Sequence, residues 1–460
     1  MLRHLLDVWM LLAALVATIA VCDPSPAFAQ GAGAVIEGVV RDQQGGVLPG
    51  ATITLRNEET GVARVATTGA DGRYRFPGLP PGRYALKAEL AGFTTVEVKD
   101  LTLTIGLALR HDFTLAIRAV EETVTVSGEA PVVDATKSEV ASVVTQQQIE
   151  TIPINTRQFL NLALLVPGTS QDGARAFYNN VTIGPGTSFY SNAFLVDGVN
   201  NTWAEEGEPR QNFPQGAVEE FKVSTTQYKA EYGLASGGLI LMVTKSGTNQ
   251  IQGEAFEYFR DKSLNALNKF EEERHDQFGD PKPDFRRHQF GFSLGGPIVK
   301  DRTHFFATIE RTQTDEFFTV STGKPEFYSS LEGTFKKPRH TNMYLFRVDH
   351  QINPNQTLFV RYGQEDDFTA CNACGGTSAA NNGFDFGKPA RSLVVGHTWV
   401  KSPRVLNDFR FQYAYAMYQV APAGTTLFTD VGQYPPERVG PQRVKVAHYF
   451  PSLSWGGNFD

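Results

Sequence analysis

The chain has 460 residues, of which 41% are hydrophobic, 11% aromatic and 20% charged, and its formal net charge is −7. This length exceeds one ordinary domain, and the negative charge excludes the basic surface expected of a nucleic-acid-binding protein. After the first two dozen residues no apolar run is long enough for a membrane-spanning helix, whereas a membrane β-barrel, whose strands alternate apolar and polar residues, stays compatible with the composition.

Residues 1–29 are predicted to be a cleaved secretory signal. Two basic residues precede an apolar stretch at 8–21, and the small residues of Ala27-Phe28-Ala29 precede Gln30, which is the order that a signal peptidase recognises. A membrane anchor is an alternative, but the apolar stretch is shorter than the ~20 residues that span a bilayer. Cys22 suggests a lipoprotein site as a second alternative. The branched residue before it counts against that alternative.

Residues 34–117 are predicted to form a small β-sandwich. Short Val, Ile, Thr and Leu runs alternate with turn sequences such as Leu48-Pro49-Gly50, and about seven strands with turns every ~8 to 12 residues are typical of a sandwich. The segment resembles the carboxypeptidase regulatory-like domain in Glu37-Gly38-Val39-Val40-Arg41-Asp42, Asp71-Gly72-Arg73-Tyr74-Arg75-Phe76 and Pro81-Gly82-Arg83-Tyr84. That resemblance implies a non-catalytic module. Its rings at Tyr74, Phe76 and Tyr84 fit either the core or a sugar-stacking platform, and the core is the commoner use.

Residues 118–128 form a linker that contains a strand-like segment. Glu122, Thr123, Val124, Thr125 and Val126 alternate Thr with Val after an acidic residue. Such a segment can add as one strand to the sheet edge of another protein. It can equally be an eighth strand of the sandwich, or plain linker.

Residues 129–249 are predicted to be a compact α+β domain. Thr145 begins a capped helix, and a second helix is predicted over 155–162, ended by Pro167-Gly168. The segments 194–200, 218–223 and 242–249 follow. Together these residues resemble the plug domain of TonB-dependent outer-membrane receptors, and the resemblance implies that 122–126 is the TonB box. With the sandwich in front, the chain resembles the Oar-like subgroup.

Residues 250–460 have the period of transmembrane barrel strands, and the abundance of Gly and Phe fits many strands and turns. The predicted strands cover 251–260, 287–294, 304–310, 344–349, 358–362, 393–399 and 408–415. Each strand has one apolar face, most clearly where Phe409, Phe411 and Tyr413 alternate with Arg410 and Gln412.

The connections between these strands predict their orientation. Short connections at 296–301, 351–354 and 401–404 alternate with long polar ones at 261–286, 312–339 and 364–390. An outer-membrane barrel has short turns in the periplasm and long loops outside.

The predicted fold class is therefore mainly β: an N-terminal immunoglobulin-like β-sandwich, an α+β plug, and a partial antiparallel transmembrane β-barrel. Seven strands do not make the even number expected of a closed barrel, and an eight-stranded barrel has no lumen for a plug. We therefore expect the chain to be the N-terminal part of a receptor whose barrel, by resemblance, has about twenty-two strands.

No catalytic, cofactor-binding or metal-binding pattern was found in the sequence. There is no His-Glu-x-x-His, no phosphate-binding loop and no Gly-x-Ser-x-Gly, and the nine histidines lack ligand spacing. Cys371 and Cys374, which remain after cleavage of the signal, could serve redox or metal chemistry. In a long exported loop a local disulfide is the favoured interpretation.

The resemblance implies an outer-membrane receptor or transporter that takes up an unidentified extracellular ligand. Its implied partners are a TonB-type energy-transducing protein, which pulls on the plug through the TonB box, and outer-membrane lipid; it implies no enzyme, no cofactor and no nucleic acid. The alternative function is a surface carbohydrate-binding or adhesion protein that the barrel anchors.

Overall fold

The computed structural model describes the sandwich, the α+β domain predicted to be a plug, which keeps that name below, and the barrel strands. The described residues are 33–117, the backbone of 123–127, and 139–423 except 153, 155–156, 172–180, 185–186, 204–206, 229–231, 234, 322–327, 380–382 and 403–404. The predicted signal at 1–29 and Glu122 lie outside the described residues.

The N-terminal domain is a sandwich of two sheets. One sheet has the order β4-β1-β7, with β8 also paired to β1, and is built from β1 (Ala34–Asp42), β4 (Arg73–Leu79), β7 (Ala108–Arg110) and β8 (Phe113–Leu115). The other has the order β3-β2-β5-β6-β9, built from β2 (Thr52–Asn57), β3 (Ala63–Thr67), β5 (Gly82–Glu89), β6 (Thr95–Leu103) and β9 (Thr123–Ser127). Alternate residues such as Ile36, Ile53 and Leu86 are fully buried between the sheets, as the period of two along a strand requires.

The plug is built around one mixed sheet with the order β10-β17-β18-β13-β14. Its strands are β10 (Val140–Val144), β17 (Val218–Thr226), β18 (Leu239–Thr244), β13 (Ala193–Val196) and β14 (Val199–Asn200). Smaller elements surround the sheet: α2 (Gln146–Thr151), η1 (Phe159–Leu165), β11 (Thr169–Gln171), β12 (Val181–Ile183), η2 (Phe189–Ser191), β15 (Thr202–Trp203), β16 (Glu208–Pro209) and η3 (Gln215–Ala217).

The two predicted plug helices had different outcomes. The first is confirmed, because α2 begins after Thr145, whose N–H donates to Gln148 Oε1 at 3.0 Å. The second was predicted as an α-helix over 155–162 but is the 3-10 helix η1, which starts four residues later. In a 3-10 helix residues three apart share one face, and Leu160 and Ala163 are both buried on that face.

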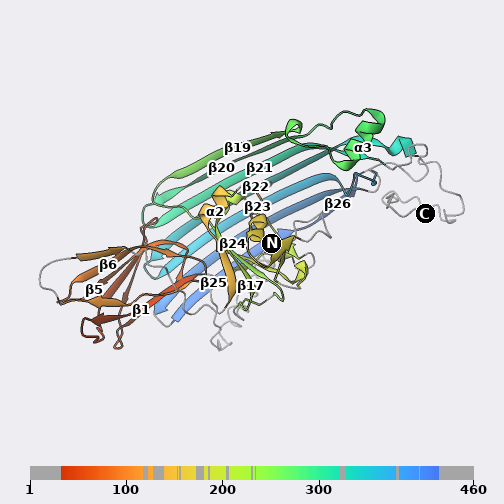
Figure 1. Cartoon of the computed structure of the whole chain (residues 1–460). Helices are drawn as coiled ribbons and strands as arrows, with labels where there is room; N and C mark the ends of the chain where they lie inside the picture. The colour runs from red at the N-terminus through yellow and green to blue at the C-terminus, as the bar shows by residue number, and fades with distance from the viewer. Residues whose placement is uncertain are drawn as a thin grey trace, which may run out of the picture.

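The barrel segment is one antiparallel sheet in the order β19-β20-β21-β22-β23-β24-β25, with β26 paired to β24. The strands are β19 (Gln252–Asp261), β20 (Arg286–Val299), β21 (Thr303–Val320), β22 (Gly333–Asn353), β23 (Gln356–Asn372), β24 (Phe384–Ser402), β25 (Val405–Ala416) and β26 (Gln419–Pro422). The sheet curves around the plug, and the sandwich lies at the end of the short turns (Figure 1). Within the described residues β19 and β25 do not pair with each other, so the barrel is partial and not closed.

The two faces of this sheet invert the burial pattern of a soluble protein. Phe292 is 50% exposed and Tyr413 is 63% exposed on the outer face. On the inner face Gln289 and Glu310 are buried. The predicted alternation is therefore confirmed, with apolar residues facing away from the plug and polar residues facing it.

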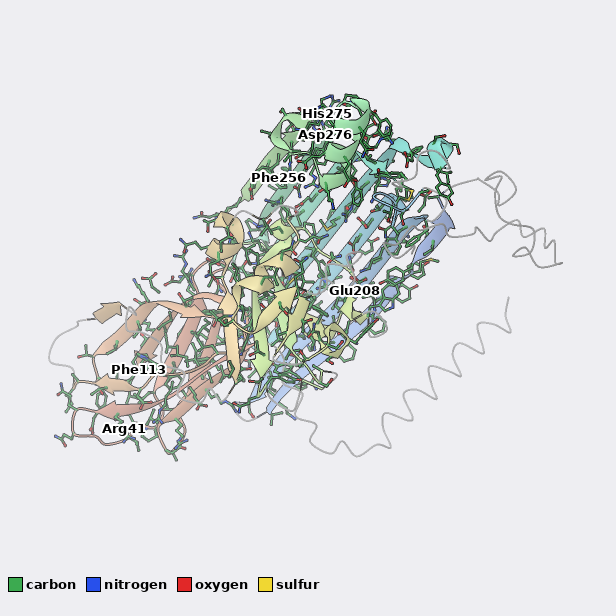
Figure 2. All side chains as sticks on the ribbon, turned by 45° about the vertical axis from the view of Figure 1, so that its right-hand side comes forward. Arg41, Phe113, Glu208, Phe256, His275 and Asp276 are labelled. Atoms are coloured by element: carbon green, nitrogen blue, oxygen red, sulfur yellow. A yellow bond between two sulfur atoms is a disulfide. The ribbon has the colours of Figure 1, made fainter. Side chains whose placement is uncertain are left out.

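The predicted long loops are shorter than expected, because the strands continue past the apolar stretch. β21 extends to Val320 and β22 begins at Gly333, inside the predicted loop 312–339. Where both faces of a hairpin are polar the periodicity of apolar residues disappears, although backbone pairing continues. The loop between β19 and β20 holds the exposed helix α3 (Lys269–Phe278). Its residues His275 and Asp276 lie at the end of the barrel sheet that is far from the sandwich (Figure 2). No helix among the described residues has the length and apolarity to cross a membrane.

Candidate functional site

A buried ion cluster joins the plug to the inner face of the barrel sheet. Its centre is Asp197, which sits with Gly198 in the tight turn between β13 and β14, with φ of 50° and 80° at the two positions. An Asp-Gly pair suits this hairpin turn because both residues must adopt a left-handed conformation. The N–H and hydroxyl of Thr244 each donate to the Asp197 carboxylate at 2.9 Å.

Two arginines from neighbouring barrel strands complete the cluster. Arg347 on β22 and Arg361 on β23 are directly paired in the sheet register, where like charges repel. Asp197 offsets that repulsion, since Arg347 Nη1 donates to it at 3.2 Å and Arg361 Nη1 also donates to it. Arg361 is 1% exposed. Removing the carboxylate would therefore leave Arg361 buried without its anion, whereas Arg347 keeps Asp349 at 2.8 Å.

The electrostatics of Asp197 follow from this geometry. Burial alone would raise the pKa of Asp197, but Arg361 and Arg347 together with the hydrogen bonds from Thr244 hold the pKa below its ordinary value. Asp197 is therefore ionised at neutral pH.

Three further polar contacts hold the plug against the sheet. Lys388 of β24 donates to Glu208 at 2.7 Å and to the Pro209 carbonyl at 2.9 Å. Glu365 of β23 accepts from the N–H and the side-chain amide of Asn212 at 2.7 and 2.8 Å. Figure 2 shows Glu208 within the curve of the barrel sheet. A fourth pair, Arg157 with Glu310 of β21 at 3.4 Å, gives the plug a contact with each of four successive strands.

Arg347 and Arg361 alternate with apolar residues along their strands, and the sequence assigned them no role. Their charge is the sequence feature that could have identified them. An Arg on the inner face of a sheet that curves around another domain is buried and needs an anion. The identity of that anion, Asp197, could not be read because it lies 150 residues away from Arg347.

A cavity of about 690 Å³ lies where the sandwich, the plug and the barrel turns meet. Its wall includes Glu59 and Tyr84 of the sandwich, Glu219 and Lys245 of the plug, and Asp349 of β22. Burial raises the pKa of Glu219 above its ordinary value. The charges lining the cavity are of both signs.

The predicted TonB box lies at the edge of the sandwich. Residues 123–127 form β9, which pairs in parallel with β6, so that Val124 is the partner of Val96 and Thr125 that of Glu97. This is the strand alternative that the sequence left open. Assignment of the segment as the TonB box stays a prediction.

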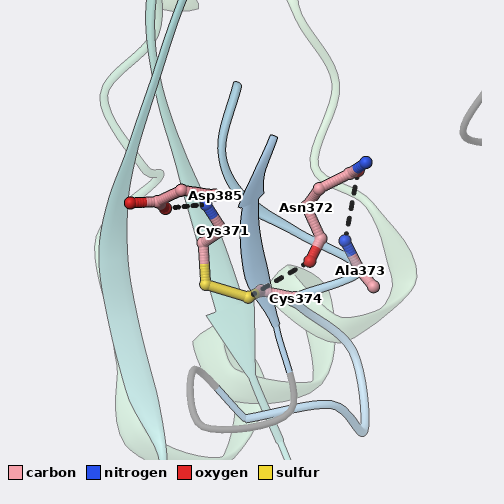
Figure 3. Close-up of a disulfide and its surroundings, with 5 residues drawn as sticks. All are labelled: Cys371, Asn372, Ala373, Cys374 and Asp385. Atoms are coloured by element: carbon pink, nitrogen blue, oxygen red, sulfur yellow. Dashed lines mark hydrogen bonds between the residues drawn. A yellow bond between two sulfur atoms is a disulfide. The ribbon is translucent and has the colours of Figure 1, made fainter. Parts of the chain in front are cut away.

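The two cysteines lie at the outer end of β23. Cys371 and Cys374 form a disulfide with Cα atoms 5.5 Å apart, and Asp385 accepts a hydrogen bond from the Cys371 N–H at 2.9 Å (Figure 3). No group of three or more His, Cys, Asp or Glu side chains in the described part of the chain is arranged to hold a metal ion.

The aromatic residues proposed as an alternative sugar platform belong to the sandwich core. Tyr74, Phe76 and Tyr84 are 2%, 4% and 4% exposed. The Tyr74 hydroxyl donates to the His111 carbonyl at 2.5 Å and that of Tyr84 to the Pro80 carbonyl at 2.8 Å. The prediction of an exposed stacking platform is therefore wrong, because these rings are almost wholly buried in the sandwich core.

Comparison with known family models matches two parts of the chain. Residues 35–116 match the carboxypeptidase regulatory-like domain, and residues 243–325 and 319–459 match the outer membrane beta barrel domain. The TonB-dependent transporter Oar of Myxococcus xanthus is 30% identical over 295 residues, which are 62% of this chain and 27% of that protein. The match thus spans about a quarter of the length of this relative.

Solved structures with similar folds include two outer-membrane proteins. The outer membrane transporter YddB from Escherichia coli has a TM-score of 0.49 and 14% identity, over 61% of this chain and 39% of that one. The siderophore receptor PirA from Pseudomonas aeruginosa has a TM-score of 0.41 and 17% identity, over 61% of this chain and 41% of that one.

Proposed function

This chain is an outer-membrane homologue of TonB-dependent transporters, and from that premise we propose that it takes up an extracellular ligand with energy supplied from the inner membrane. The sandwich lies in the periplasm, the segment 122–126 binds the TonB-type energy-transducing protein, and the plug opens the passage when it is pulled. The outer membrane holds no energy source of its own, so the partner must supply the work.

The observation that carries this proposal is the polar seam between plug and barrel. A permanently closed plug would be held as well by apolar packing, which avoids the desolvation cost of buried ions. Phe306 and Leu345 of the barrel sheet do pack into the apolar core of the plug. Beside them, however, Asp197, Glu208 and Glu365 meet partners on β22, β23 and β24. Water can replace such contacts once the plug begins to move, so a polar seam suits a plug that must open and close again.

The outer face of the barrel sheet supports the proposal that the barrel contacts outer-membrane lipid. The exposed rings include Phe409, Phe411, Tyr413 and Tyr415, which alternate along β25. In water such a face would be an aggregation site. In our proposal these rings contact outer-membrane lipid.

The test uses the gene for this chain in its native host, with Val124→Pro and Val124→Ile as a matched pair. Strand addition needs backbone donors and an extended backbone, and proline removes a donor. The probe is the purified periplasmic domain of the host's TonB-type protein, and its affinity for the chain in outer-membrane vesicles is measured.

We expect Val124→Pro to lower that affinity at least about tenfold and Val124→Ile to leave it within about twofold. In energised wild-type cells we expect added protease to cleave the plug, and an uncoupler should abolish this cleavage. Cells carrying Val124→Pro should show no such cleavage even when energised. Equal affinities for the wild type and Val124→Pro would contradict the proposal.

A further inference from the structure

Among the described residues, the outer edge of β9 has no partner strand. In the sheet order β3-β2-β5-β6-β9 the last strand is β9, and among the described residues only β6 pairs with it. The register runs without a break from Thr95 with Thr123 to Lys99 with Ser127. In the described part of the chain one edge of β9 is therefore paired, and the other offers its backbone groups to an added strand.

The strand that β9 pairs with leads straight into the plug. β6 ends at Leu103, and residues 104–107 form a tight turn in which the Leu107 N–H donates to the Thr104 carbonyl at 3.1 Å. Gly106, with φ of +67°, supplies the left-handed position that this turn needs. The turn projects Ile105 away from the sandwich core.

Ile105 is inserted into the plug. It is 1% exposed and packs in one apolar cluster with Ala193, Leu239 and Leu241, which belong to β13 and β18. Its N–H also donates to the Glu220 carboxylate of β17. A side chain and a backbone group thus fasten the end of β6 to three strands of the plug sheet.

We propose that β9 stays paired with β6 while the energy-transducing partner adds a strand to its outer edge, so that the sandwich passes the pull to the plug through Ile105. This inference rests on the proposed function and names the surface that its partner uses. An added strand of alternating character satisfies the open backbone groups of β9, and no β9–β6 hydrogen bond has to break.

Parallel pairing suits this role. A pull directed along β9 loads its evenly spaced hydrogen bonds to β6 together rather than one after another. The alternative path to the plug sheet is the chain itself, through residues 128–138. The path through Ile105 is a direct packing contact between the sandwich and the plug sheet.

A reversible lock between β9 and β6 tests whether β9 stays in place. Glu97 and Thr125 are register partners, and neighbouring strands lie about 4.8 Å apart, within the range that a disulfide bridges. Glu97→Cys with Thr125→Cys is made in the full chain, and Lys99→Cys with Ser127→Cys is a second pair in the same register. Thr125→Cys alone and the wild type are the controls, and each is measured under both oxidising and reducing conditions.

The probe is again the purified periplasmic domain of the TonB-type protein. We expect each oxidised pair to bind it within about twofold of its reduced form. A loss of tenfold or more on oxidation that reduction reverses would show that β9 leaves β6, and would overturn this inference while leaving the proposed function intact. If the wild type itself fails to bind the domain, the proposed function fails instead.

The contact of Ile105 is tested by pulling the probe domain away from the full chain in a lipid bilayer. With Ile105→Asp the pull must run through residues 128–138, so the extension before the first plug event should grow by up to about 40 Å. Unchanged probe affinity shows that β9 still binds in this variant. An extension equal to that of the wild type would refute the relay through Ile105.

Discussion

The contact between Glu220 and Ile105 makes docking of the sandwich on the plug depend on pH. Burial raises the pKa of Glu220 to about 8, with a further contribution from Glu219, while the hydrogen bond from the Ile105 N–H and the charge of Lys222 act in the opposite direction. Because the docked state raises this pKa, docking is strongest below the ordinary carboxyl pKa of about 4.5 and weakens until the pH passes about 8.

The size of the effect follows from the same shift. Each pKa unit corresponds to about 1.4 kcal/mol. Between pH 5 and pH 8 docking should therefore lose at most about 3.5 kcal/mol, roughly 400-fold in the docking equilibrium. This is an upper limit, because it assigns an exposed carboxyl to the undocked state. Glu220→Gln keeps an oxygen that accepts from Ile105 and removes the titration. The variant should therefore dock equally well across this range.

Hydrogen exchange at the Ile105 amide measures the docking contact directly. The amide exchange rate of Ile105 is measured in the full chain in detergent at pH 5 to 8. At each pH it is divided by the intrinsic exchange rate of the same amide in a peptide of residues 100–110, which gives the protection. Protection in the wild type should fall with rising pH, and protection in Glu220→Gln should not. Glu89→Gln, on the sandwich surface, is the control and should behave as the wild type. Protection that is constant with pH in the wild type would refute the reasoning.

Three other predictions concern the seam, the outer loop and the N-terminus. Asp197→Ala leaves Arg361 buried without its anion and should destabilise the plug by about 3 to 5 kcal/mol, seen as a lower melting temperature in detergent; an unchanged melting temperature would contradict the role of the cluster. Cys374→Ser opens a very short loop, so the loss should be on the order of 2 kcal/mol or less and confined to faster proteolysis around residue 374. Mass spectrometry of the exported protein should find Gln30 at the N-terminus, and an intact Met1 in outer-membrane fractions would refute cleavage.

The sequence was sufficient for the features that depend on local periodicity. Alternation of Phe409, Phe411 and Tyr413 with polar residues is a property of neighbouring residues, and it predicted both the strand and its exposed apolar face. The turn chemistry of the sandwich and the Thr145 cap of α2 are equally local. The predicted loop 312–339 was too long for the same reason, because the strands continue where both faces are polar and the periodicity is lost.

Only the tertiary structure decided which distant residues meet. Arg347 and Arg361 were visible as charges on a polar face, but their partner Asp197 comes from a hairpin turn of another domain. Ile105 looked like any apolar residue of a sandwich strand end, and its burial against Leu239 depends on how two domains dock. Such contacts have no signature in the spacing of residues, because they arise from the packing of separate sheets and not from the path of one strand.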